Sequence, residues 1–155
     1  MIQRVQTIYL LMAAVFSGLM FFFPFIEMVD SNQYLLQFNY NGIFRLEPDG
    51  NVLLQSALPV TIIISATLVL SLVTIFLYKK RILQMRLCIY NILLLLGTMG
   101  LIYYYYSQLI DKLAIGEQAF RPAFIFPLAA AILNFLAFRG IRRDEKLIRS
   151  YDRIR

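Results

Sequence analysis

The chain has 155 residues and a net charge of +6, and 60% of its residues are hydrophobic while 15% are charged. Because a soluble domain has about 25% charged residues and a chain this short cannot bury so much apolar surface, the composition indicates a small integral membrane protein. With no His and a single Cys, a His-based catalytic triad, an intrachain disulfide and a Cys/His zinc cluster are excluded.

Four apolar runs without a charged side chain follow one another, at about residues 7–26, 57–78, 87–106 and 122–138. A helix of about 20 residues spans a hydrocarbon core of roughly 30 Å. The runs lack the alternation of a membrane barrel, so their backbone groups must be paired within helices. We therefore predict an all-α integral membrane protein, a four-transmembrane-helix bundle in which residues 1–155 form a single membrane domain.

The basic residues set the orientation of the predicted bundle. Twelve of the 15 Lys and Arg residues lie before the first run, between the second and third, or after the fourth. The other three are Arg45, Lys112 and Arg121. Because cytoplasmic segments are enriched in Lys and Arg, both termini are expected in the cytoplasm.

Two segments are then expected on the opposite side of the membrane. Residues 27–56 contain the turn signals Asn41-Gly42 and Asp49-Gly50 between short apolar stretches, and this pattern predicts a small β-meander. Residues 107–121 follow a run of four tyrosines. Tyrosine is enriched at membrane surfaces, and we expect a short interfacial helix here.

Few residues of the chain suggest a metal or redox site. The spacing of the acidic residues in the first outer segment, Glu27, Asp30, Glu47 and Asp49, matches no EF-hand pattern. A solvated acidic loop is the simpler interpretation, and we expect no metal or cofactor. Cys88 is interpreted as a structural thiol, with palmitoylation or redox sensing as alternatives.

Polar and small residues within the apolar runs are candidates for contacts between helices. Asn91 and Asn134 lie at similar depth in the third and fourth runs, and we expect a hydrogen bond between their amides. Small and hydroxyl residues let helices approach closely; those chosen for helix packing are Thr61, Ser65, Ser71, Gly97 and Gly100. A polar pathway through the bundle is the alternative interpretation of the hydroxyl residues.

The last segment, 139–155, is predicted to be a basic cytoplasmic tail that forms an amphipathic helix. The residues expected to dock on lipid or on a partner are Arg142, Arg143, Lys146, Arg149, Tyr151 and Arg153. Anionic phospholipid is the favoured ligand because basic residues bind the negative membrane surface. A membrane protein partner is the second alternative, and RNA on a ribosome is the least favoured. No DNA contact is expected.

The two ends of the chain carry a family resemblance. The segments MIQRVQTIYLL at residues 1–11 and RDEKLIRSYDRIR at residues 143–155 resemble a domain-of-unknown-function family of small four-span inner-membrane proteins of Bacteroidota. The resemblance covers the whole chain. It implies an inner-membrane location and makes 27–56 a periplasmic loop, but it implies no catalytic or binding residues.

Three classes of function remain open. We expect a non-enzymatic accessory or structural subunit of a larger membrane protein assembly, such as secretion, insertion or envelope machinery. A small transporter or channel component is the alternative, although the runs lack the ionisable groups that transport pathways use. An enzyme is the least favoured class because no His is available as an acid or base.

Overall fold

The computed structural model describes residues 5–30, 34–48, 50–78, 80–112 and 115–152. Its helices are α1 (Val5–Leu19), α2 (Leu58–Phe76), α3 (Arg81–Lys112) and α4 (Phe126–Asp152), the last preceded by the short 3-10 helix η1 (Pro122–Ile125). Its strands are β1 (Ile26–Asp30), β2 (Leu35–Asn39), β3 (Gly42–Glu47), β4 (Gly50–Ser56) and β5 (Ile115–Phe120).

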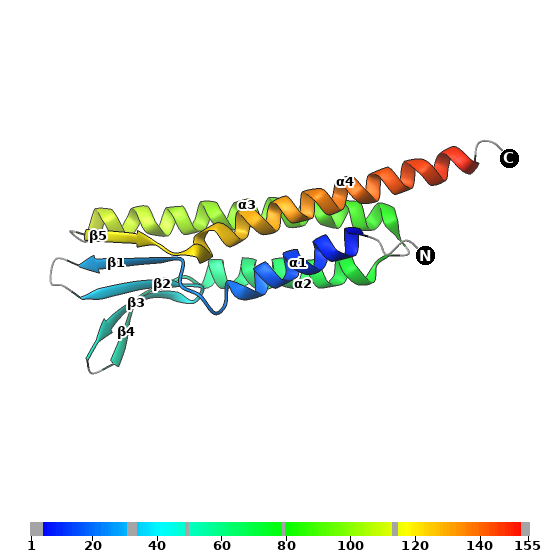
Figure 1. Cartoon of the computed structure of the whole chain (residues 1–155). Coiled ribbons are helices and arrows are strands. Elements are labelled where there is room, and N and C mark those ends of the chain that lie inside the picture. Colours follow the sequence, from blue (N-terminus) through cyan, green and yellow to red (C-terminus); the bar gives the residue numbers. More distant parts are fainter. Residues whose placement is uncertain (1–4, 31–33, 49, 79, 113–114, 153–155) are drawn as a thin grey trace.

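The helices form an elongated bundle with the sheet at one end (Figure 1). We call this the sheet end of the molecule. The opposite end, where α1 begins and α4 ends, is called the terminal end (Figure 1). The α2–α3 connection also lies at the terminal end, so the segments rich in Lys and Arg are gathered there.

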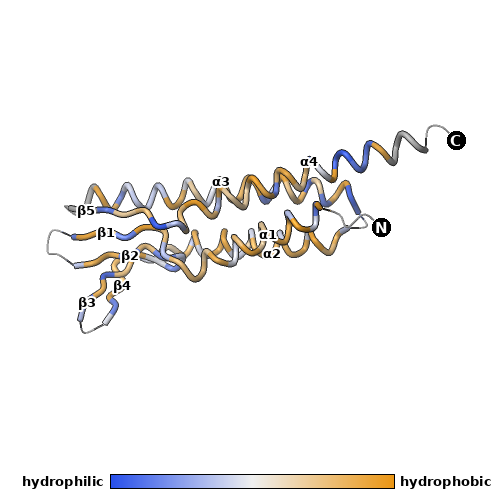
Figure 2. Tube along the Cα trace, in the orientation of Figure 1, coloured by the Kyte–Doolittle hydropathy of each residue, from blue (hydrophilic) through white to orange (hydrophobic). Residues whose placement is uncertain are grey.

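Among the residues that the structure describes, three helical segments are long and apolar enough to cross a membrane, namely Leu58–Phe76, Arg81–Ile110 and Pro122–Leu147. Helix α1 is apolar but has only 15 residues. Apolar residues dominate the middle of the bundle (Figure 2), and large apolar side chains such as Ile62 and Leu93 are exposed on its outside. An apolar exterior of this kind suits lipid rather than water, so the chain is a multi-pass membrane protein.

The sheet has five antiparallel strands in the order β4-β3-β2-β1-β5. Strands β2, β3 and β4 form the predicted meander. The turn that joins β2 to β3 is Tyr40-Asn41, one position before the predicted Asn41-Gly42, because Gly42 already pairs with Asn39 as the first residue of β3. Gly42 begins β3 at a place where a Cβ atom would lie only 2.5 Å from the carbonyl oxygen of Gln55 on β4. Only glycine fits there without a shift of the backbone.

The prediction of an all-α fold is wrong, because the molecule is mixed α/β. The short helix predicted within 107–121 does not form. Helix α3 instead continues to Lys112, and β5 pairs with β1, with Ile26 opposite Phe120. Strand β1 is paired with β2 on its other side, so β5 satisfies backbone groups that would otherwise form a free sheet edge.

The predicted bounds of the apolar spans also need correction. The first helix ends at Leu19, and Ile26, expected as its last residue, begins β1. Pro24 has no amide hydrogen to continue a helix, and the amide of Phe25 already donates to the carbonyl oxygen of Phe38, at 2.8 Å. Helix α4 continues from the fourth span into the tail without a break, so the tail is not a separate helix.

The main core lies where the sheet packs on the ends of α2 and α3. Its sheet members include Ile26, Met28, Leu36, Phe38 and Ile43, with Phe25 just before β1, and its helix members include Val60, Ile64, Ile102, Tyr105 and Leu109. A second cluster, Leu10, Cys88, Ala137 and Ile141, joins three helices nearer the terminal end. Burial of Cys88 at 0% exposure fits the interpretation of a structural thiol.

Candidate functional site

A buried polar centre joins three helices in the middle of the bundle. The Nδ2 of Asn91 on α3 lies 2.7 Å from Oγ of Ser71 on α2 and 3.3 Å from Oδ1 of Asn134 on α4, and donates to both. All three side chains are fully buried. The Nδ2 of Asn134 donates to the carbonyl oxygen of Ala130, at 2.9 Å. The structure thus brings together three residues that the sequence singled out.

The other hydroxyl groups of the bundle described here donate to backbone carbonyl oxygens. Thr61 on α2 donates to the carbonyl oxygen of Tyr40, at 2.8 Å, and so attaches the sheet to the helix. Ser65 donates to the carbonyl oxygen of Thr61 within its own helix. Thr67, Thr74 and Thr98 likewise donate to their own helices. These bonds favour a packing role over a polar pathway, because each hydroxyl hydrogen already has an acceptor.

Gly97 and Gly100 do not contribute to helix packing within the chain, which corrects the prediction. Both are exposed, and a Cβ atom at either position would meet no atom within 4 Å. Thr98, which lies between them in the sequence, is fully buried instead. Close approach occurs elsewhere, at Gly140 on α4, where a Cβ atom would lie 2.8 Å from Cγ of Gln6 on α1.

An ion pair connects residues 27–56 with residues 107–121 at the sheet end. Arg121, which follows β5, donates a hydrogen bond to the carboxylate of Glu27 on β1. Gln37 on β2 donates to the same carboxylate, at 3.1 Å. The bond from Arg121 is the largest influence on the Glu27 carboxyl and lowers its pKa below the ordinary value, against the opposing effect of burial. The same bond raises the pKa of Arg121.

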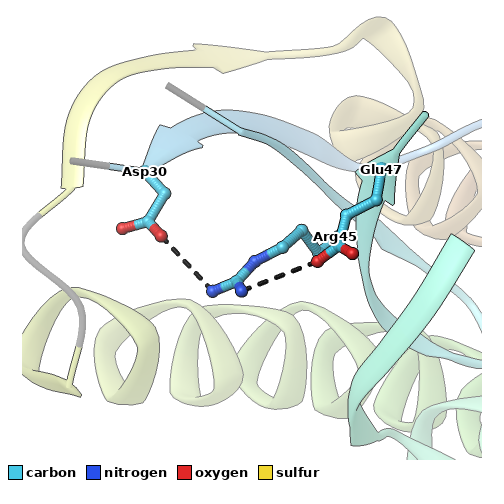
Figure 3. Close-up of polar contacts among 3 residues, drawn as sticks. All are labelled: Asp30, Arg45 and Glu47. Carbon is cyan, nitrogen blue, oxygen red and sulfur yellow. Dashed lines mark hydrogen bonds and ion pairs between the residues drawn. The ribbon is translucent and has the colours of Figure 1, made fainter. Parts of the chain in front are cut away.

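A second charged cluster spans the sheet from β1 to β3 (Figure 3). The guanidinium of Arg45 lies 3.3 Å from Asp30 and 3.8 Å from Glu47, measured between nitrogen and oxygen. It also lies 5.5 Å from the ring centre of Tyr34. Asp49 is outside the described residues. Within the part of the chain that the structure describes, no three acidic or Cys side chains are grouped to hold a metal ion.

Strand β4 presents an apolar edge that sequence reasoning missed. It is an end strand of the sheet, and Val52, Leu53 and Leu54 are 45%, 51% and 38% exposed. The β3–β4 hairpin extends away from the helices and from β1 and β5 (Figure 1). The sequence shows a short apolar stretch after Gly50. It does not show that this stretch is exposed, because exposure depends on which surfaces the rest of the fold covers.

The tail residues project from the bundle at the terminal end, on the last part of α4 (Figure 1). Arg142, Arg143 and Lys146 are exposed. The neighbouring Asp144 accepts a hydrogen bond from Nε2 of Gln6, at 2.5 Å, so one side of this segment packs on α1. Arg149 and Tyr151 belong to α4, although their side chains are outside the described set, and Arg153 lies outside the described residues.

A comparison with known proteins gives one family. The family model described as Domain of unknown function (DUF4293) matches residues 2–154, nearly the whole chain. No curated protein matches the chain.

Proposed function

The chain belongs to the DUF4293 family of domains of unknown function, and from this premise we propose that it is an accessory subunit of a larger membrane protein assembly, with no catalytic activity of its own. The assembly belongs to the secretion, insertion or envelope machinery of the inner membrane. The resemblance of the two ends supports an origin in a bacterium of the Bacteroidota.

The proposal includes an orientation in which the sheet is periplasmic and both termini are cytoplasmic. The basic residues at the terminal end support this orientation through the positive-inside rule. In the proposed topology α1 is the first of four spans. Its 15 residues cover about 22 Å, and the aromatic residues that follow it, including Phe22 and Phe23, are exposed and would lie near the membrane surface in this topology.

The exposed edge of β4 is the observation that carries the proposal. The outer edge of an end strand has backbone groups that no neighbouring strand pairs, and natural proteins usually protect such edges with charged residues or a covering segment. In β4 the middle of the strand is instead Val52-Leu53-Leu54, all exposed. A partner that adds a strand to this edge would pair the backbone and bury the apolar side chains.

Site-specific photocrosslinking tests the proposal in living cells. A photoreactive amino acid at Leu53 is expected to give one discrete crosslinked protein product. The same amino acid at Ile62, which is 66% exposed on α2 and faces lipid in the proposed topology, is expected to give no discrete protein product. A crosslink at both positions would indicate random collision rather than docking.

A variant of the edge tests the same contact by affinity purification. The triple substitution Val52→Thr, Leu53→Thr and Leu54→Thr keeps a strand-forming sequence and removes the apolar surface. The co-purifying partner is expected to be lost, while Ile62→Thr retains it. Purification of the unaltered chain without any partner, together with no crosslink at Leu53, would reject the proposal.

A further inference from the structure

A groove of about 370 Å³ opens at the terminal end between the first turns of α3 and the last part of α4. Its apolar lining comes from Ile82, Met85 and Ile89 on α3 and from Phe138 on α4. The spacing of the α3 residues places them on one side of that helix. The groove therefore has an apolar wall along the direction of the spans.

Charged residues line the same groove beside the apolar wall. Arg86 comes from α3, Arg142 and Lys146 come from α4, and Glu145 is the acidic member. The three bases are exposed, so the groove has an excess of positive charge that is open to a ligand. Arg143, adjacent in sequence to Arg142, does not line it. The three bases therefore come together because α3 and α4 face each other, and not because the tail as a whole is basic.

The depth of the groove matches that of a lipid headgroup. Arg86 directly precedes the apolar run 87–106, and Phe138 ends the run 122–138, so the bases lie at the membrane boundary. Ile89 and Phe138 lie within these runs and continue the apolar wall toward the hydrocarbon core, whereas Ile82 and Met85 precede Arg86 and flank the bases. Basic pockets between transmembrane helices bind anionic headgroups. Arg pairs with phosphate oxygens through two parallel hydrogen bonds, and Lys binds phosphate as a point charge.

We propose that this groove binds one anionic phospholipid, with its phosphate at Arg86, Arg142 and Lys146 and an acyl chain along Ile89 and Phe138. The bound lipid contacts both α3 and α4. The inference is independent of the proposed function, because it uses neither β4 nor a protein partner.

Native mass spectrometry of the full chain in mild detergent tests the site, with phosphatidylglycerol as the probe and phosphatidylethanolamine as the zwitterionic comparison. The unaltered chain is expected to retain one phosphatidylglycerol. The triple variant Arg86→Gln, Arg142→Gln and Lys146→Gln is expected to weaken binding roughly a hundredfold, because each base near an anionic group contributes about fivefold.

The matched control is Lys80→Gln, Arg139→Gln and Arg143→Gln. It removes the same charge from the terminal end at exposed positions that do not line the groove. This variant is expected to bind phosphatidylglycerol within about threefold of the unaltered chain. Equal losses in the two triple variants would overturn the proposal, because they would show attraction to the tail as a whole. Circular dichroism establishes that both variants keep their helices.

Two further experiments distinguish a lipid site from a site for free phosphate. The substitution Ile89→Trp fills the groove without a change of charge and is expected to abolish lipid retention, whereas Tyr90→Trp, exposed but outside the groove, retains it. Soluble glycerol phosphate at millimolar concentration is expected not to displace the lipid. Displacement by glycerol phosphate, or normal retention in Ile89→Trp, would overturn the proposal.

Discussion

The side chain of Asn91 on α3 forms polar contacts with both α2 and α4. An amide in lipid costs free energy when it has no partner, and Asn91 Nδ2 uses Ser71 and Asn134 as acceptors. Hydrogen bonds between membrane helices contribute only about 0.6 kcal/mol on average, because the separated helices also find partners. The contact therefore fixes which faces of α2, α3 and α4 meet more than it adds to total stability.

A double-mutant cycle measures this contact. Asn91→Ala and Asn134→Ala are expected to couple by about 0.6 kcal/mol and by no more than about 1.7 kcal/mol, read from reversible unfolding in mixed micelles. Thr98→Val is the control partner for Asn91→Ala, since Thr98 bonds to its own helix, and this second pair is expected to be additive. A coupling of zero between the two Asn substitutions would contradict the hydrogen bond.

Glu27 gives a prediction for pH. Its pKa is lowered in the folded state, mainly by the hydrogen bond from Arg121. A carboxyl group with a lowered folded pKa stabilises the fold above its unfolded pKa, and this contribution is lost as the pH falls through the folded pKa. Acidification from neutral pH is therefore expected to weaken the attachment of β5 only once the pH falls below the ordinary pKa of a glutamate carboxyl group.

Carbon-13 NMR of the Glu27 carboxyl group tests this assignment. Arg121→Gln is expected to raise the Glu27 pKa toward its ordinary value, because the largest lowering influence is removed. Arg45 carries the same charge but pairs with Asp30 and Glu47 rather than with Glu27. Arg45→Gln should therefore leave the pKa of Glu27 unchanged. An unchanged titration in Arg121→Gln would show that the pair does not form in solution.

The β3–β4 hairpin is the element most dependent on a single backbone position. A Cβ atom at Gly42 would lie 2.5 Å from the carbonyl oxygen of Gln55 and 2.9 Å from Cδ1 of Leu53. Gly42→Ala is therefore expected to cost about 1–3 kcal/mol by overpacking. Hydrogen exchange measured by mass spectrometry should show faster exchange across Ile43–Ser56.

Gly97→Ala serves as the comparison for Gly42→Ala. A Cβ atom at Gly97 meets nothing within 4 Å, and alanine is a better helix former than glycine by up to about 1 kcal/mol. This substitution is expected to leave exchange in the hairpin unchanged and to stabilise α3 slightly. If both variants opened the hairpin equally, the close approach at Gly42 would not be the cause.

At the scale of the whole molecule, the sheet end and the terminal end are predicted to face opposite compartments. In a Cys88→Ser background, Asn51→Cys on exposed β4 should react with a membrane-impermeant maleimide added to spheroplasts. Lys146→Cys should react only after the membrane is permeabilised, and Ile62→Cys should react in neither case because it faces lipid. The reverse order of labelling at Asn51 and Lys146 would overturn the orientation.

Features that rest on local composition and periodicity can be predicted from the amino-acid sequence alone. Apolar runs without charge predict long apolar helices because lipid leaves the backbone no other partner, and turn residues such as Asn41-Gly42 predict the β2–β4 meander because they suit tight hairpins. The similar depth of Asn91 and Asn134 was also readable, since helical rise converts position into depth.

Only the tertiary structure decided the features that need distant segments to meet. Residues 115–120 form β5 because β1, almost 90 positions earlier, offers an edge, and no local pattern distinguished this strand from a short helix. Three other features also depend on contacts between distant segments. They are the ion pair of Glu27 with Arg121, the outward position of Gly97 and the shared groove of Arg86 and Arg142. Each depends on which faces pack together, and packing is set by the whole chain at once.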